Sequence, residues 1–423
     1  MSARLPICST VGPWRNEGRR AGRRPVNVFE RRGVRTVINA AGTVTRLSGG
    51  IMRSEVAAAM AEASSLCVEM TELEAHASQI IANVTGAEAG YITSGASAGL
   101  LLATAACLTG LDASRMAKLP DTTGMKNEVI VAQGQRNGYD HAVRAAGGKL
   151  VEVGLADRLS GAGVRDVEGW DFAEAINEKT AAVFYVAGRN VRPPLSEVVE
   201  VAHQAGMPVI VDAAAELPPQ SNLRRFIAEG ADLVAFSGGK AIGGPQASGI
   251  LCGRRDLVMA AALQHLDMDV LWDFWNPPAS LIDKSRIKGL PRHGIGRSCK
   301  VGKEEIIGLL TAIEMFVAEG DTKRHGRWLL TARQLVDRLA SLESVEVAVT
   351  GASDVQQVPK VELRFERGAE WAAARLVHAL LDTSPPVYVD QTFLDRGVLT
   401  LDPVCLRPGE AEVIARAVLN HLD

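Results

Sequence analysis

The stretch ADLVAFSGGK, residues 231–240, places a lysine in a glycine-rich turn directly after an apolar run. The run has the length and composition of a buried strand, so Lys240 is expected at the carboxyl edge of a sheet, where α/β proteins bind ligands. A partly desolvated amine at this edge can have a lowered pKa and form a Schiff base with a carbonyl compound. Ser237, three residues earlier, can donate a hydrogen bond to a phosphate. The alternative interpretation is a turn lysine in water.

Similar apolar runs recur on both sides of this stretch and alternate with helix-like segments. They lie at residues 90–93, 128–132, 150–153, 181–186, 208–212, 233–236 and 249–252. Short apolar strands that alternate with helices predict an α/β fold with a mostly parallel, seven-stranded sheet covered on both faces. Ser54 is a plausible N-cap for a helix over 54–63, and Gly86 is expected to end a helix over 72–84.

The chain has 423 residues, which is too long for one simple core. Residues 300–423 differ from the alternating region. They open with two long helix-like segments, 304–318 and 327–342, and end in a helix over 409–421, which predicts a smaller α+β C-terminal domain. The predicted organisation is an Arg-rich disordered tail (1–26), an N-terminal arm (27–60), a large domain (61–299) and this small domain (300–423).

Asp212 ends the apolar run PVIVD, residues 208–212. An acid at the end of a buried strand can pair with a pyridinium nitrogen, keep it protonated and make the ring a stronger electron sink. Ala214, two residues later, is small enough for a flat ring to lie against it. The alternative is that Asp212 caps the next helix.

The segment SGASAG, residues 94–99, lies between a predicted strand and a predicted helix. Its small residues let backbone N–H groups and hydroxyls at the helix N-terminus meet a phosphate, although many strand–helix turns look similar. A phosphate turn, then an Asp, then a Lys: this order and spacing resemble the aspartate-aminotransferase superfamily, the pyridoxal 5′-phosphate (PLP) enzymes of fold type I. The resemblance implies that His141, or else Tyr139, stacks on the cofactor. Alternatively, His141 is a polar residue on an amphipathic helix.

A narrower resemblance rests on five segments. They are VINAAGT (37–43), EAG (88–90) with the Ser-Gly turn that follows it, LVEVG (150–154), VDAA (211–214) and FSGGKAIGGPQ (236–246). Together they resemble the enzymes related to L-seryl-tRNA(Sec) selenium transferase, and within that group the D-glucosaminate-6-phosphate ammonia-lyase type. The resemblance covers residues 27 to 420.

This resemblance implies a role for each matching residue. Lys240 would form the Schiff base and later shuttle protons, while Asp212 would pair with the pyridine nitrogen. Arg297 would reach the cofactor phosphate or a substrate carboxylate, unless it is simply a surface arginine before a helix. The residues implied for the phosphate are Ser94, Gly95, Ala96, Ser97 and Ser237. Those expected to line the substrate pocket are Thr43, Thr45, Arg46, Glu216 and Gln246.

The sequence departs from the family pattern in two respects. Many fold type I enzymes have an arginine about eight residues after the lysine to pair with the phosphate, but here that residue is Ser248. The phosphate charge must then be met otherwise, for example by an arginine of a neighbouring subunit. The selenium transferases also carry an additional N-terminal domain for tRNA, whereas only a short Arg-rich tail precedes the arm here. By analogy we expect a homodimer or a higher homo-oligomer, with the arm reaching the partner.

Charge and composition argue against several classes of function. The formal net charge is −3, so the chain lacks the basic field of nucleic-acid binders. No run approaches the roughly 20 apolar residues that a membrane span needs. The six cysteines are scattered without the spacing of metal ligands, which argues against a metal site and favours a reduced, cytoplasmic location.

The leading hypothesis is a PLP-dependent lyase that catalyses α,β-elimination from a small-molecule substrate, a β-hydroxy amino acid or an amino sugar acid. The products would be a 2-keto acid and ammonia. Retro-aldol cleavage, racemisation and β-replacement would use the same cofactor residues, so the sequence separates these reactions poorly. A selenium-transferase-like enzyme that acts on tRNA and a PLP-binding protein without turnover are the alternatives from other classes.

Overall fold

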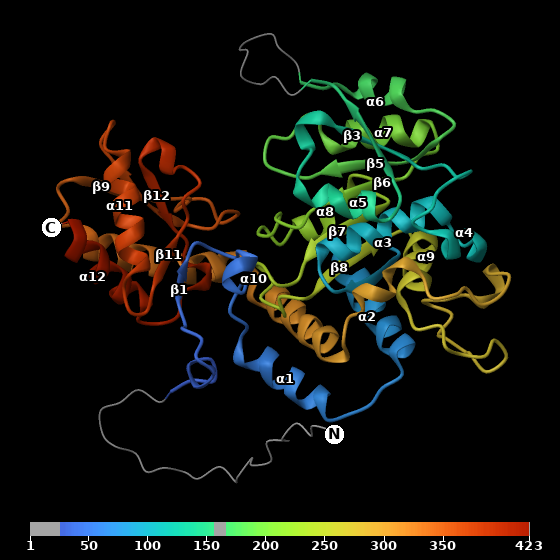
Figure 1. Cartoon of the computed structure of the whole chain (residues 1–423), viewed down its shortest axis with the longest axis horizontal. Helices are drawn as coiled ribbons and strands as arrows, with labels where there is room; N and C mark the ends of the chain where they lie inside the picture. Colours follow the sequence, from blue (N-terminus) through green and yellow to red (C-terminus); the bar gives the residue numbers. More distant parts are fainter. Residues whose placement is uncertain (1–25, 156–165, 423) are drawn as a thin grey trace, which may run out of the picture.

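The computed structural model describes residues 26–155 and 166–422 and is built around a seven-stranded sheet (Figure 1). The strand order is β2-β8-β7-β6-β5-β3-β4, and β8 alone runs antiparallel to its neighbours. Each strand lies within one residue of its predicted position. Their bounds are β2 Ala89–Thr93, β3 Glu128–Ala132, β4 Lys149–Val153, β5 Thr180–Val186, β6 Val209–Asp212, β7 Leu233–Ser237 and β8 Gly249–Gly253.

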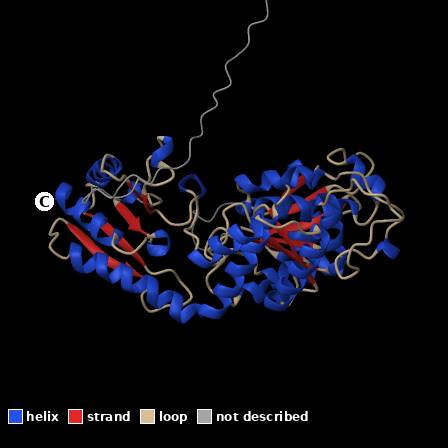
Figure 2. Ribbon diagram, turned by 90° about the horizontal axis from the view of Figure 1, so that it is seen from below, coloured by secondary structure: helices blue, strands red, loops and turns tan. Residues whose placement is uncertain are grey.

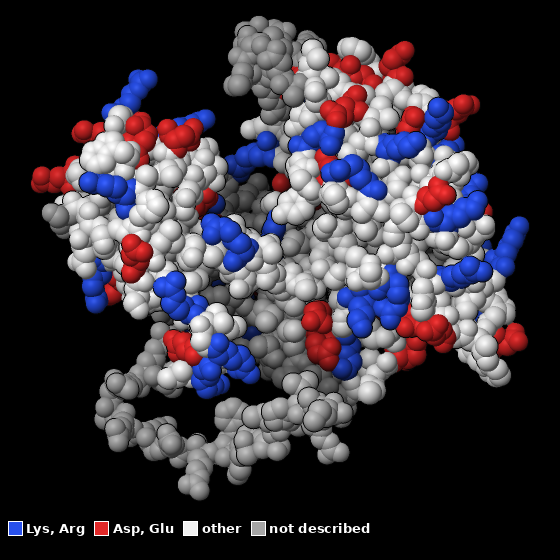
Figure 3. All heavy atoms as spheres, in the orientation of Figure 1, with Lys and Arg blue, Asp and Glu red and all other residues white. Residues whose placement is uncertain are grey.

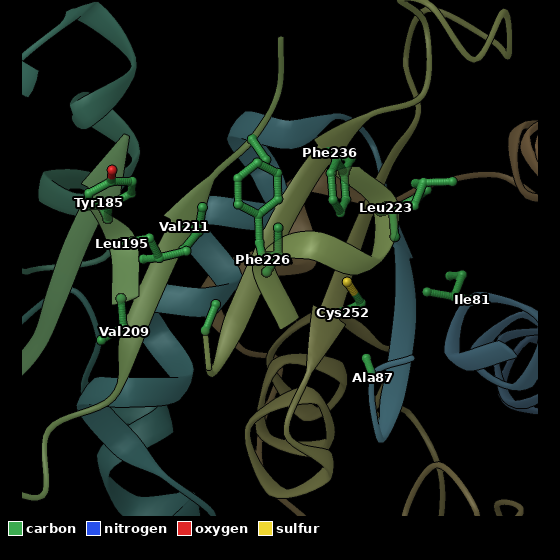
Figure 4. Close-up of a cluster of buried hydrophobic side chains, with 14 of the residues drawn as sticks. Ile81, Ala87, Tyr185, Leu195, Val209, Val211, Leu223, Phe226, Phe236 and Cys252 are labelled. Atoms are coloured by element: carbon green, nitrogen blue, oxygen red, sulfur yellow. The ribbon is translucent and has the colours of Figure 1, made fainter. Parts of the chain in front are cut away.

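Both faces of this sheet are buried, which explains why its strands read as continuous apolar runs (Figure 2). In β3, for example, Val129 and Val131 face one core while Ile130 and Ala132 face the other. One core is closed by α3 (Ala96–Thr109), α4 (Ala113–Lys118), α5 (His141–Ala145) and α9 (Arg255–His265). The other, part of which is drawn in Figure 4, is closed by α1 (Ser54–Ser64), α2 (Met70–Thr85), α6 (Gly169–Ala175), α7 (Leu195–Gln204), α8 (Asn222–Ala228) and the first half of α10 (Lys303–Leu339).

A second, C-terminal sheet has its own core. It is antiparallel, with the order β12-β10-β9, and its strands span Val398–Leu401, Lys360–Phe365 and Val345–Thr350. Helices α11 (Glu370–Leu381) and α12 (Glu410–Leu422) pack on it. The 37-residue α10, Lys303–Leu339, extends from one sheet to the other and breaks at Gly320, where φ is 70° and ψ is 164°. The two helices predicted here are therefore the two parts of α10 on either side of this break.

The N-terminal arm pairs with its own chain. Its strand β1 (Ile38–Ala40) lies parallel to β11 (Val387–Val389), and Ile38 and Ala40 join the C-terminal core. Contact of the arm with a partner subunit stays a prediction, as do the boundaries between the four predicted segments. The Arg-rich tail lies outside the described residues, apart from Val26.

Several local predictions were wrong. Ser54 is the first residue of α1 rather than its N-cap, because Arg53 has the extended N-cap backbone and no side chain caps the helix. Helix α9 was not predicted, because its apolar residues surround it on most sides and show no amphipathic period. Within the described residues, no helix has both the length and the apolar character needed to cross a bilayer.

Glu74 on α2 makes stability dependent on pH. It is 1 % exposed, and only one of its oxygens has a partner in the described chain, the N–H of Ile92 at 3.1 Å. Burial raises the pKa of Glu74 from its ordinary 4.5 to about 8. The unfolded chain therefore loses this proton first, so the stabilisation is complete below the unfolded pKa and is lost as pH rises to about 8.

We expect Glu74→Gln to remove this dependence. As the pH rises from 5 to 8.5, the free energy of unfolding of the wild type should fall relative to that of the variant by at most about 5 kcal/mol. Urea denaturation of both proteins at each pH measures this difference. Parallel pH profiles for the two proteins would show that Glu74 is already ionised in the folded state.

Candidate active site

Lys240 follows β7 in a turn that only glycines can form. A Cβ on Gly238 would lie 2.3 Å from Oγ of Ser248, and one on Gly239 would lie 2.5 Å from Cα of Gln246. This close packing holds the lysine at the carboxyl edge of the sheet, with its side chain partly buried. Burial lowers the pKa of Lys240, while the nearby carboxylates of Asp212 and Glu216 act in the opposite direction.

Asp212 ends the adjacent strand β6 and is 7 % exposed. Its Oδ1 accepts a hydrogen bond from the N–H of Ala214 at 3.0 Å, and it makes no ion pair among the described residues. Burial raises the pKa of Asp212, while this hydrogen bond and Lys240 act to lower it. A buried carboxylate without a fixed cation suits a cationic ring nitrogen, because the new partner would offset the cost of burial.

The turn before α3 presents unused backbone donors. Gly95 has a φ of 135°, and the first main-chain bond of the helix joins N of Gly99 to O of Gly95 at 3.0 Å. The N–H groups of residues 96–98 therefore have no main-chain acceptor in the described chain, which is the arrangement that binds phosphate. The Ser94 hydroxyl is used differently, since it donates to the carbonyl of Cys299 at 2.8 Å. Ser97 is exposed and Ser237 is partly buried at the end of β7.

Some of the residues predicted to line the substrate pocket lie at the turn that holds Lys240. The N–H of Gly50 bonds to O of Gly239 at 3.2 Å, and Nε2 of Gln246 donates to O of Thr45 at 3.0 Å. The arm of the same chain thus crosses the turn that holds Lys240. Thr43 is half-buried and Arg46 is exposed, with its guanidinium 5.6 Å from the ring centre of Tyr388 on β11.

Glu216 lies within electrostatic reach of both Asp212 and Lys240. Burial raises its pKa, and Arg189 is one of the cations that act to lower it. Arg189 follows β5 and meets Asp354 of the C-terminal sheet domain at 3.6 Å. Sequence reasoning missed Arg189 and Tyr388, since no local motif marks either residue.

The buried polar side chain that follows β3 is not the predicted one. His141 and Tyr139 are both exposed, and Nδ1 of His141 lies 3.2 Å from Arg144, so stacking by either stays a prediction. Gln135 is 8 % exposed instead, and its Oε1 accepts the N–H of Val186 at 2.9 Å. Val186 is the register partner of Asp212 in the neighbouring strand, which places Gln135 beside the acid.

Comparison with known proteins agrees with this geometry. The family model described as SelA: L-seryl-tRNA selenium transferase matches residues 37–269, more than half of the chain. The chain belongs to this family. The selenium transferase family resemblance and the aspartate-aminotransferase-like fold, PLP fold type I, are therefore both confirmed.

Members and relatives of the selenium transferase family match over nearly the whole chain. D-glucosaminate-6-phosphate ammonia lyase of Salmonella typhimurium is 32 % identical over 93 % of this chain and 98 % of its own length. The 5′-C-glycyluridine monooxygenase-decarboxylase of a Streptomyces species is also 32 % identical, over 93 % of this chain and 92 % of its own. A solved structure of D-glucosaminate-6-phosphate ammonia-lyase superposes with a TM-score of 0.75 at 28 % identity, covering 94 % of this chain and 100 % of the other.

The lowered pKa of Lys240 predicts how the apoprotein takes up PLP. Only the neutral amine attacks a carbonyl, so the rate of uptake should rise with pH and level off below the 10.5 of an ordinary lysine. Glu216→Gln removes a carboxylate that raises the pKa of Lys240, so its curve should shift to lower pH. Stopped-flow absorbance after mixing apoprotein with PLP between pH 6.5 and 10 measures both curves. Superimposable curves would contradict the electrostatic coupling.

Proposed function

We propose that this chain is a PLP-dependent lyase that removes the β-hydroxyl and amino groups of a β-hydroxy amino acid or amino sugar acid. The observation that carries this proposal is that Lys240 and Asp212 lie at the ends of adjacent strands. Lys240 is partly buried, and Asp212 is buried without an ion pair among the described residues. The relative at 32 % identity over 93 % of the chain, an ammonia lyase, supports elimination as the reaction.

The residues present fit PLP. Asp212 would hold a proton on the ring nitrogen, the N–H groups of residues 96–98 would meet the phosphate, and Ala214 would leave room for the ring. When bound, PLP supplies an electron sink for the charge left at the substrate α-carbon.

In the proposed reaction, Nζ of Lys240 removes the α-proton, since its lowered pKa leaves part of the amine neutral. The protonated Nζ would then deliver that proton to the departing hydroxyl, which leaves as water. Hydrolysis of the resulting enamine consumes one water and releases a 2-keto acid and ammonia, so the overall reaction balances. Gln246 and the arm residues Thr43 and Thr45 would orient the polar end of the substrate.

Substrate-dependent absorbance tests the proposal. The purified protein is titrated with D- and L-β-hydroxy amino acids and amino sugar acids, while 2-keto acid and ammonia are quantified. Equal amounts of both products support the lyase. Aldehyde with glycine would identify an aldolase, an inverted amino acid a racemase, and bound PLP with no response to any substrate a binding protein.

A second candidate reaction is favoured by the other relative, a monooxygenase-decarboxylase at the same identity. That reaction would consume O₂ and release CO₂, whereas elimination consumes no O₂ and releases no CO₂. Turnover under argon with no CO₂ formed would exclude it.

By analogy with the fold we also propose that the protein is a homo-oligomer in the cytoplasm. Light scattering that gives the monomer mass for the active protein would contradict the assembly.

A further inference from the structure

The five-residue 3₁₀ segment Ile295–Cys299, which carries Arg297, is held tightly by the end of α9. Oε1 of Gln264 accepts the N–H of Ile295 at 3.2 Å, and Oδ2 of Asp267 accepts from Nη2 of Arg297 at 2.9 Å. A Cβ on Gly294 would lie 2.4 Å from Oε1 of Gln264, so the chain approaches α9 as closely as glycine permits. The position of Arg297 is therefore set by the end of α9 and by Asp267, which follows it.

A buried hydrogen-bond chain links this segment to the phosphate turn. Nε2 of His265 lies 3.0 Å from O of Cys299, and Oγ of Ser94 donates to the same carbonyl at 2.8 Å. A carbonyl oxygen only accepts, so Nε2 carries the hydrogen. Nδ1 of the neutral ring then accepts from Oη of Tyr91 at 2.8 Å. Tyr91 is 0 % exposed and His265 is 5 % exposed, so both side chains are buried.

Arg297 lies near the turn that begins at Ser94. It shares a pocket of about 440 Å³ with Ser94 and His265, and neither Asp212 nor Lys240 lines this pocket. Its bond to Asp267 uses one of five guanidinium donors, so others remain free. Ser248, where many fold type I enzymes have the phosphate arginine, is fully buried and donates to O of Pro245 at 2.5 Å. It supplies no charge.

We propose that Tyr91 and His265 are positioning residues that fix Arg297 beside the Ser94 turn, where its guanidinium pairs with the phosphate of the cofactor in the same chain. The inference rests on the proposed function, because it takes the bound group to be PLP. It replaces an arginine of a neighbouring subunit with one supplied by the chain itself.

Comparing PLP with pyridoxal, which lacks the phosphate, tests this role separately from structural damage. We expect His265→Leu to weaken PLP binding about tenfold, because it removes the buried hydrogen bond to Cys299 that holds the segment carrying Arg297. It should change pyridoxal binding less than about twofold. Arg297→Ala should show the same selectivity, with a loss of about 10- to 100-fold for PLP alone. His265→Gln retains a donor for Cys299 and should remain near wild type. Equilibrium absorbance titration of the apoprotein gives each affinity.

His325→Leu is a matched control. His325 is likewise 5 % exposed with Nε2 3.0 Å from a backbone carbonyl, that of Gly351, but it lies on α10 away from the turn. It should affect both ligands equally. If His265→Leu also weakens both equally, or leaves PLP unaffected, the positioning role is wrong. If His265→Leu does not fold, Tyr91→Phe removes only the supporting bond and should show a smaller loss confined to PLP. A wild type that binds neither ligand would overturn the proposed function itself.

Discussion

Lys240→Ala is expected to lower kcat for 2-keto acid formation by at least about 1,000-fold, because it removes both the group that attaches the cofactor and the base for the α-proton. The neighbours of Lys240 do not replace it. Glu216 is another titratable side chain of the site, and burial raises its pKa, but a carboxylate remains a weaker base than a neutral amine. Keto acid and ammonia assays with saturating PLP measure the effect.

Chemical rescue distinguishes the base from a structural role. A small primary amine such as methylamine should restore part of the activity of Lys240→Ala, because the truncated side chain leaves space where Nζ stood. Lys179→Ala, on the exposed surface after α6, is the control and should match wild type. If Lys240→Ala kept keto acid production without added amine, the assignment of the base would be refuted.

Asp212→Asn has the second largest expected effect. The amide keeps the shape and can still accept from the N–H of Ala214, but it cannot hold a proton on the ring nitrogen. We expect kcat to fall by about 100- to 1,000-fold with PLP still bound, because the ring becomes a poorer electron sink. The cofactor absorbance reports binding and the rate of α-deuterium exchange reports the proton step.

Asp232→Asn is the control for this substitution. Asp232 is 5 % exposed, but it stands at the opposite edge of the sheet, just before β7, and its partners are His203, Arg254 and the N–H of Val209. This substitution should lower stability without slowing deuterium exchange per folded molecule. Equal slowing of exchange in both variants would mean that Asp212 acts only through the fold.

The sequence by itself determined the sheet and its chemical edge. Strands buried on both faces must be apolar throughout, so seven runs could be located to within a residue, and the turns that follow them could be assigned to one edge. Lys240, Asp212 and the turn at 94–97 were found because each lies at or shortly after the carboxyl end of a strand. Their chemistry is local to a few residues.

The tertiary structure decided everything that joins distant segments. Ser94 and Cys299 are separated by 205 positions, and Arg46 and Tyr388 also lie far apart in the sequence, so no local pattern marks either contact. The reversed direction of β8 depends on which strands pair, and the place of Gln135 beside Asp212 depends on the register between β5 and β6. Strand composition records burial but not which neighbour a strand will have, and side-chain hydrogen bonds form only after packing has brought their partners within about 3 Å.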